Sequence, residues 1–271
     1  MERVVLFLSV LIAFSACDKI DSDNFIDGEI IVQPEDIDRK ILIEDFTGHK
    51  CQNCPEAAAE IHNIQNTFPN QVVAIAIHAG YFSEPNPPQA PYLTTDFRTD
   101  NGNEIHDFFG PQSYPNGMVN RSGYPSDVLS NYTDWANMVG SLTGSTAKVG
   151  INISYIINGQ EMTIDVSTNA KVSFTTSHNV VVCITEDHII DWQTIAGQGD
   201  VSDYEHNHVL RDVVGSTWGQ EIDKISVGDE TTNTFTCIID PSWNLKNCNI
   251  IAYVYDTSNY EVIQVEEIHI K

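Results

Sequence analysis

The residues of this sequence best suited to covalent chemistry are two cysteines, Cys51 and Cys54, separated by Gln52 and Asn53. Cysteine acts as a nucleophile in its thiolate form, and two thiols at this spacing can form and break a disulfide. The neighbouring positive charge of Lys50 favours the thiolate of Cys51. We therefore predict a thiol–disulfide exchange site in which Cys51 attacks and Cys54 resolves.

The flanking sequence predicts how this pair is positioned. An apolar run at residues 40–46 predicts a buried strand, and a Thr-Gly turn follows it. Apolar residues at helical spacing predict an amphipathic helix over residues 54–67, and the apolar run 72–77 predicts a second, parallel strand. The cysteines then lie at the carboxyl end of the first strand and at a helix N-terminus, where the helix dipole favours a thiolate.

The order of strand, turn, Cys-x-x-Cys and helix resembles the redox site of thioredoxin-like proteins. Asp45 and Phe46 stand where thioredoxins have a buried Asp-Phe pair. The resemblance implies that Asp45 transfers a proton to Cys54, and the alternative is a strand-end carboxylate in solvent. No tryptophan precedes Cys51, and the two residues between the cysteines differ from the usual pairs, so the resemblance implies no particular reduction potential.

Thioredoxin-like proteins also place a cis-proline beside the disulfide, and the residue before it presents its backbone to the substrate. Tyr114-Pro115 precedes an expected strand at residues 118–121 and fits this position. An isolated X-Pro bond is cis in only about 5–6% of cases, so this expectation depends on the context. The resemblance implies a cis bond at Pro115 and a substrate contact at Tyr114.

The cysteine pair also has a structural interpretation. In an exported protein, a Cys-x-x-Cys can be a permanent disulfide that fixes a turn. A zinc site is less consistent with the sequence, because one such pair supplies half of the four ligands and no second Cys-x-x-Cys or His-x-x-His occurs. We expect no cofactor, and exchange and a static disulfide both remain open.

Two other sets of residues are candidates for a site. His206 and His208 would face the same side of a strand and could share a metal ion, although such pairs are more often polar residues at a strand end. Cys237 and Cys248 flank a predicted turn, and pairing of their strands would bring them close enough for a structural disulfide. Cys183 lies in an apolar run and is expected to be a buried free thiol.

Charge and the N-terminal sequence restrict the partners. The formal net charge is −25, from 38 acidic and 13 basic residues, so the surface would repel nucleic acid. A basic residue and a short apolar run precede Cys17, with small residues at the two positions before it. This resembles a bacterial lipobox and predicts a signal peptide at residues 1–16 and a lipid on Cys17 that anchors the protein to a membrane. The alternative is an ordinary secretory signal.

The rest of the chain divides into three predicted parts. Residues 17–38 are acidic and predict a flexible tether, in which the acidic cluster resembles a surface-export signal of Bacteroidetes lipoproteins or is simply a solvated linker. Residues 39–145 predict an α/β thioredoxin-like domain, with a long irregular loop at 79–100. Residues 146–271 contain several short alternating strands and predict an all-β, immunoglobulin-like sandwich.

Three segments together resemble one family. They are residues 43–55, 114–121 and 206–211, and they are similar to the Bacteroidetes outer-membrane lipoproteins named for a twenty-eight-kilodalton surface antigen. The resemblance implies a thioredoxin-like domain, a β-rich domain and an outer-membrane lipoprotein on the periplasmic or cell-surface face. Members are described as adhesins or receptors, and their activity is largely undefined.

The sequence therefore leaves two functions open. The first is thiol–disulfide exchange with thiols and disulfides of exported proteins, with Cys51, Cys54, Asp45, Tyr114 and Pro115 at the site. The second is a non-catalytic adhesin or receptor for a host or surface ligand, with a static Cys51–Cys54 disulfide. An exposed Cys51 sulfur would favour the first.

Overall fold

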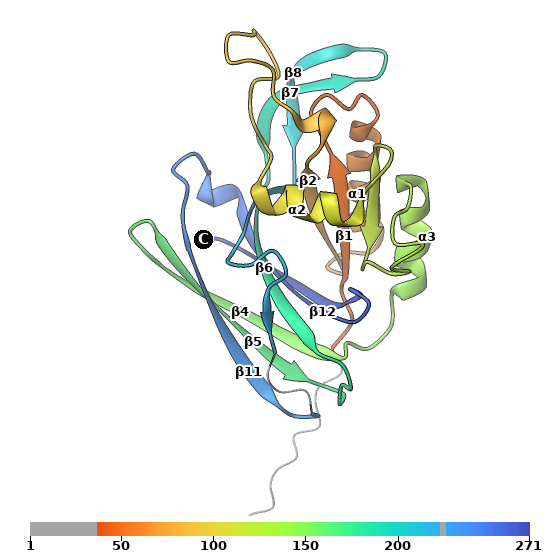
Figure 1. Ribbon diagram of the computed structural model, residues 1–271, viewed down its shortest axis with the longest axis vertical. Helices are drawn as coiled ribbons and strands as arrows, with labels where there is room; N and C mark the ends of the chain where they lie inside the picture. Colours follow the sequence, from red (N-terminus) through yellow and green to blue (C-terminus); the bar gives the residue numbers. More distant parts are fainter. Residues whose placement is uncertain (1–36, 223–225) are drawn as a thin grey trace, which may run out of the picture. The chain divides into compact units, whose positions relative to one another are not determined.

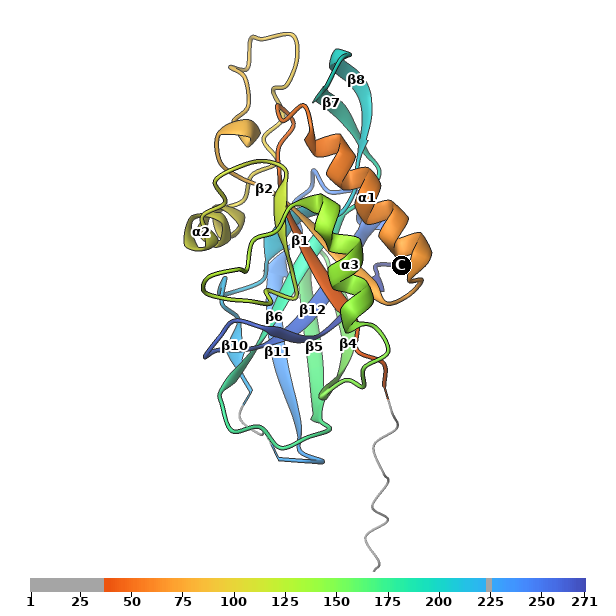
Figure 2. The ribbon, with the colours of Figure 1, turned by 90° about the vertical axis from the view of Figure 1, so that its right-hand side faces the viewer.

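The computed structural model describes residues 37–222 and 226–271 (Figure 1, Figure 2). The predicted signal peptide at 1–16, the lipid on Cys17 and nearly all of the tether at 17–38 lie outside these residues and stay predictions. None of the helices within the described ranges is long and apolar enough to cross a membrane.

The cysteine region forms a β-α-β unit. Strand β1 (Ile41–Thr47) is followed by helix α1 (Cys54–Thr67) and strand β2 (Val72–His78), and the two strands are parallel. Both strands are buried along their whole length, as expected for strands covered on both faces. The sequence predicted these three elements to within one residue at each end.

After this unit the chain first alternates short helices with strands, and from residue 149 onward it forms almost only strands. In chain order they are η2 (Tyr81–Ser83), α2 (Asp100–Phe109), β3 (Asn116–Val119), α3 (Tyr132–Leu142), β4 (Val149–Asn158), β5 (Glu161–Ala170), β6 (His178–Glu186), β7 (Ile189–Ile195), β8 (Gly199–His206), β9 (Val209–Val213), β10 (Gln220–Glu221), β11 (Glu230–Ile238), η3 (Leu245–Asn247), β12 (Cys248–Asp256) and β13 (Val262–His269). The hairpin of β7 and β8 is an element that the sequence did not predict.

One mixed sheet contains strands from both ends of the chain (Figure 1). Its strands lie in the order β13-β12-β6-β9-β2-β1-β3, and β10 adds to β6. Strands β2 and β9 pair at Ala76 and Val209, where the Ala76 N–H donates to the His208 carbonyl at 2.8 Å. Because side chains alternate along a strand, this sheet contributes to cores on both of its faces.

Different elements cover the two faces of this sheet. Helices α1 and α3 pack against one face of β1, β2 and β3, while α2 packs against the other face. A second sheet, with the order β11-β5-β4, packs against β6 and β12. The hairpin β7-β8 is a separate two-stranded sheet.

The predicted fold class, an α/β thioredoxin-like domain followed by an all-β, immunoglobulin-like sandwich, is wrong. The described residues are mostly β, and strands β6, β9, β12 and β13 extend the same sheet that contains β1, β2 and β3. Strand β9 is parallel to β2 on one side and antiparallel to β6 on the other, so it joins the two sets of strands. Periodicity identifies a strand but not its distant partner, which is why the prediction failed. The limits 39–145 and 146–271 stay predictions.

A buried ion pair connects the early strands to the late ones. Arg121 donates from Nε and Nη2 to the two carboxylate oxygens of Glu44 in β1 at 2.7 and 2.6 Å, and Nη2 also donates to the Tyr253 hydroxyl in β12 at 2.8 Å. The Arg121 side chain is 0% exposed and that of Glu44 is 1% exposed. The guanidinium carbon lies 5.1 Å from the ring centres of Phe109 and Tyr253. Because both charges are buried, removal of either one would leave the other without a partner and would destabilise the fold.

We expect Arg121→Met to lower the free energy of unfolding by about 3–5 kcal/mol, because it leaves the Glu44 carboxylate buried without its partner. Urea denaturation followed by tryptophan fluorescence measures the change. The matched control is Arg98→Met, which removes a partly exposed pair with Asp96 at 2.8 Å and should change stability by less than about 1 kcal/mol. Equal losses in the two variants would contradict the importance of the buried pair.

Candidate functional site

Cys51 and Cys54 form a disulfide at the N-terminus of α1. Their Cα atoms are 5.4 Å apart, and α1 begins at Cys54 with Pro55 in its first turn. Both cysteines are buried, with exposed fractions of 3% for Cys51 and 2% for Cys54. The predicted pair is therefore joined, but Cys51 does not have the exposure that a freely accessible nucleophile would have.

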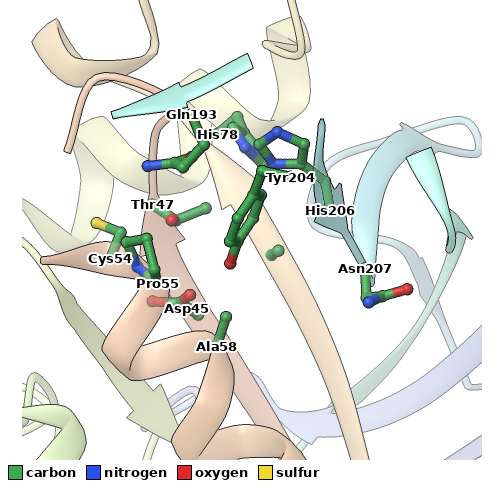
Figure 3. Close-up of a pocket in the computed structure, with 11 residues that line it drawn as sticks. Asp45, Thr47, Cys54, Pro55, Ala58, His78, Gln193, Tyr204, His206 and Asn207 are labelled. Carbon is green, nitrogen blue, oxygen red and sulfur yellow. The ribbon is translucent and has the colours of Figure 1, made fainter. Parts of the chain in front are cut away.

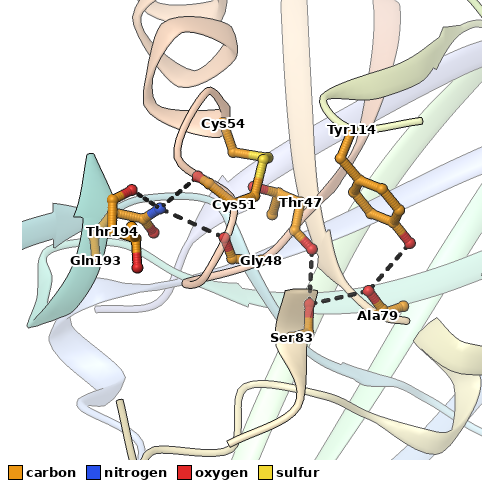
Figure 4. The surroundings of a disulfide bond; sticks show 9 residues. All are labelled: Thr47, Gly48, Cys51, Cys54, Ala79, Ser83, Tyr114, Gln193 and Thr194. Atoms are coloured by element: carbon orange, nitrogen blue, oxygen red, sulfur yellow. Dashed lines mark hydrogen bonds between the residues drawn. A yellow bond between two sulfur atoms is a disulfide. The ribbon is translucent and has the colours of Figure 1, made fainter. Parts of the chain in front are cut away.

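The segment after β2 supports one side of the disulfide loop (Figure 4). The Lys50 N–H donates to the Phe82 carbonyl at 3.0 Å, and the Ser83 hydroxyl donates to the Thr47 carbonyl at 2.7 Å. A Cβ atom at Gly48 would lie 2.5 Å from the carbonyl carbon and oxygen of Phe82, so the close approach of the two segments requires glycine there. The loop at 79–100 is thus held against the disulfide by its first residues.

The β7-β8 hairpin covers another side of the same loop. The Gln193 side-chain amide donates to the Cys51 carbonyl at 3.0 Å, and Gln193 is buried. The Thr194 N–H donates to the His49 carbonyl at 2.8 Å, and the Ala196 N–H donates to the Gln52 carbonyl at 3.0 Å. Three successive contacts therefore fix the hairpin on the backbone of the cysteine loop. No pattern of residues predicted that this hairpin would pack on the cysteine loop.

Asp45 lines a small cavity next to Cys54. Oδ1 of Asp45 is buried and has no hydrogen-bond partner among the described residues. The cavity has a volume of about 30 Å³, and Cys54, Tyr204 and His206 also line it (Figure 3). Burial raises the pKa of Asp45 to about 8, so the carboxyl holds a proton at neutral pH. The solvent-exposed carboxylate that was the alternative for Asp45 is thus not the form in the structure.

The raised pKa of Asp45 makes stability depend on pH. Between about pH 4 and pH 8 the folded protein retains a proton that the unfolded chain releases, so the free energy of unfolding falls as the pH rises through this range. We expect Asp45→Asn, which keeps the shape but does not titrate, to remove up to about 5 kcal/mol of this fall. Denaturant titrations at several pH values measure it, and identical pH slopes in the two proteins would contradict the prediction.

His206 and His208, which were considered as ligands of a shared metal ion, lie in different surroundings. His206 is buried, and one of its ring nitrogens lies 3.3 Å from the Trp192 carbonyl, while His208 pairs with Asp187 at 3.2 Å. Burial lowers the pKa of His206 to about 4, which keeps this ring neutral. Within the part of the chain that the structure describes, no three or more side chains of metal-ligating type are grouped to hold an ion. The geometry gives no support to a shared metal ion.

The histidine cluster around Phe97 was missed in the sequence. The His78 and His206 rings both lie 5.0 Å from the Phe97 ring, and the His49 ring lies 6.1 Å from it. Burial lowers the pKa of His49 and lowers that of His78 well below its ordinary value, because the charged form of the ring is unfavourable away from water. The three rings come from separate segments, so spacing along the chain could not reveal them.

The Tyr114–Pro115 peptide bond is cis, as expected. The Tyr114 hydroxyl donates to the Ala79 carbonyl at 3.3 Å and is also bonded to His106. Burial raises the pKa of Tyr114 to about 12, so the phenol is neutral at physiological pH. The Tyr114 ring lies 5.4 Å from the Phe82 ring, which places it next to the segment that supports the disulfide loop.

The candidate disulfide between Cys237 and Cys248 is not formed. Both cysteines are buried and unpaired in the described part of the chain, as is Cys183. Cys237 belongs to β11 in the three-stranded sheet, whereas Cys248 begins β12 in the large sheet, so the turn between them connects two sheets rather than two paired strands. The prediction of a buried free thiol at Cys183 is confirmed.

Comparison with protein families identifies the class of protein. Residues 103–271 match the model of the family described as outer membrane protein Omp28, and the chain therefore belongs to this family. This confirms the family resemblance and the expected location in the outer membrane. The match includes Tyr114, Pro115, His206 and His208 but not Cys51 and Cys54. No curated protein matches the chain.

Three solved structures are similar to the chain. HBP35 of Porphyromonas gingivalis is 15% identical with a TM-score of 0.68, and the match covers 86% of this chain and 76% of that one. AGR_C_4864 from Agrobacterium tumefaciens is 16% identical with a TM-score of 0.52, over 86% and 95% of the two chains. A domain of the outer membrane lipoprotein Omp28 from Porphyromonas gingivalis is 24% identical with a TM-score of 0.35, over 46% and 89%. The first two likenesses concern the fold alone, and no conclusion is drawn from the third, whose TM-score is lower.

Proposed function

We propose that the Cys51–Cys54 disulfide is a thiol–disulfide exchange centre that acts on exported proteins at the outer membrane. The observation that carries the proposal is the buried carboxyl of Asp45, which lines the same cavity as Cys54 and whose Oδ1 has no partner in the described residues. Burying a polar group without a partner costs several kcal/mol. A static disulfide gains nothing from such a group, whereas a leaving thiolate needs a proton donor.

The arrangement supports the following exchange. A substrate thiolate attacks Sγ of Cys51, the bond between the two sulfurs breaks, and its electron pair passes to Sγ of Cys54. The carboxyl of Asp45 gives its proton to Cys54, which leaves a mixed disulfide between substrate and Cys51. A second substrate thiol then attacks this mixed disulfide, so that the substrate is oxidised and the cysteine pair is reduced. The reverse sequence reduces a substrate disulfide.

Burial of the cysteines favours a second candidate function. With Cys51 only 3% exposed, a substrate thiolate can attack only after a segment packed on the cysteine loop moves, and we propose that this segment is the β7-β8 hairpin. A disulfide that stays covered would be structural, and the protein would then be a non-catalytic surface adhesin or receptor. The two functions thus differ in whether the segments packed on the cysteine loop move and expose the sulfur of Cys51.

The reduction potential of the cysteine pair distinguishes the two functions. We expect glutathione titration of the chain carrying Cys17→Ser to give a value between about −120 and −270 mV, the range of working oxidoreductases. Cys51→Ser removes the disulfide and should abolish exchange with a model substrate. A potential below about −300 mV would mark a structural disulfide and would favour the adhesin.

The hairpin contact at Gln193 should control access to the disulfide. We expect Gln193→Ala to speed reduction of the disulfide by dithiothreitol about tenfold, because the closed state loses the side-chain hydrogen bond to the Cys51 carbonyl. Alkylation of the released thiols followed by mass spectrometry measures the rate. The control is Gln198→Ala, an exposed glutamine of the same hairpin, which should not change the rate. If the disulfide of both variants is reduced at the wild-type rate, the hairpin does not control access to the disulfide.

A further inference from the structure

Three aromatic side chains form a row next to the disulfide. We call Tyr81, Phe82 and Tyr114 the aromatic ledge. The rings of Tyr81 and Phe82 are 5.4 Å apart, and those of Phe82 and Tyr114 are also 5.4 Å apart. The row therefore runs from the residue before the cis-proline outward to η2 at the start of the long loop.

The backbone holds the aromatic ledge in a fixed position relative to the cysteines. Phe82 is tied to the disulfide loop by its hydrogen bond from the Lys50 N–H and by its close packing on Gly48. Tyr114 is tied to the end of β2 by its hydrogen bond to the Ala79 carbonyl. Figure 4 shows Tyr114 and Gln193 on opposite sides of the disulfide, so the ledge and the hairpin do not compete for the same side.

Tyr81 contacts the Phe82 ring on one side, and most of its surface is exposed to solvent. It is 75% exposed, the highest value among the exposed large apolar and aromatic side chains of the described residues. Tyrosine offers a large contact area with few rotatable bonds, and it is enriched at binding surfaces for this reason. The Tyr81 ring is thus available to a partner, whereas Phe82 and Tyr114 provide the support behind it.

We propose that the aromatic ledge binds the polypeptide segment beside the substrate cysteine and selects substrates with an aromatic or large aliphatic side chain there. This inference rests on the proposed exchange function. The occupant is a polypeptide because the ledge continues directly from the disulfide loop, where a substrate cysteine must be placed. An apolar neighbour of that cysteine would cover the Tyr81 ring and would pack on it edge-to-face or in an offset stack.

The test compares a small dithiol with two dithiol peptides as reductants of the full chain carrying Cys17→Ser. One peptide has phenylalanine beside its first cysteine, and the other has glycine at this position and is otherwise identical. For Tyr81→Ala, we expect the phenylalanine peptide to need a concentration about five to ten times higher for its half-maximal rate. The rates with dithiothreitol and with the glycine peptide should not change.

Ile156→Ala is the control, because Ile156 is 72% exposed, close to the value for Tyr81, but lies in β4, outside both the ledge and the β7-β8 hairpin. It should leave all three rates unchanged. If wild type reacts with both peptides equally well, or if Tyr81→Ala slows dithiothreitol as much as the phenylalanine peptide, the ledge does not select the substrate and the exchange function still stands. If wild type reacts with none of the three reductants, the exchange function fails, and the ledge fails with it.

Discussion

The arrangement of this protein depends on the buried ion pair between Glu44 and Arg121. Glu44 lies in β1, two strands away from β9 in the sheet, and the Tyr253 hydroxyl that shares Arg121 lies in β12. The ion pair and its hydrogen bond to Tyr253 therefore connect β1 with β12, that is, an early strand with a late one. Charges without water around them must be matched in position, so the pair specifies one relative placement of these strands.

The disulfide illustrates how a reactive group can be contained by backbone contacts. The segment containing η2 bonds to one part of the cysteine loop, and the β7-β8 hairpin bonds to another. Asp45 lies on the inner side, where its carboxyl remains protonated because of burial. The cysteine loop is thus held by main-chain hydrogen bonds on two sides, and a protonated carboxyl lines the cavity next to Cys54.

Local elements could be predicted from the sequence, but their partners could not. The limits of α1 and of the first two strands follow from periodicity and from the cysteine turn, and Asp45, Cys54 and Tyr114 lie near one another in the structure. The fold class was wrong because the pairing of β2 with β9 joins distant residues. Gln193, Tyr204 and the histidine cluster were missed for the same reason: the β7-β8 hairpin is half exposed and has no regular alternation, and it reaches the site only through the fold.

The order of the covering elements along the chain has a consequence for how the disulfide is made. A polypeptide emerges from its N-terminus, so Cys51 and Cys54 are presented to an oxidant before residues 189–206, which form the hairpin, have followed. The two thiols lie three residues apart and need no distant segment to meet. Oxidation can thus be complete before the hairpin packs on the cysteine loop. Formation of the disulfide is thus separated in time from any later reaction at its sulfur atoms.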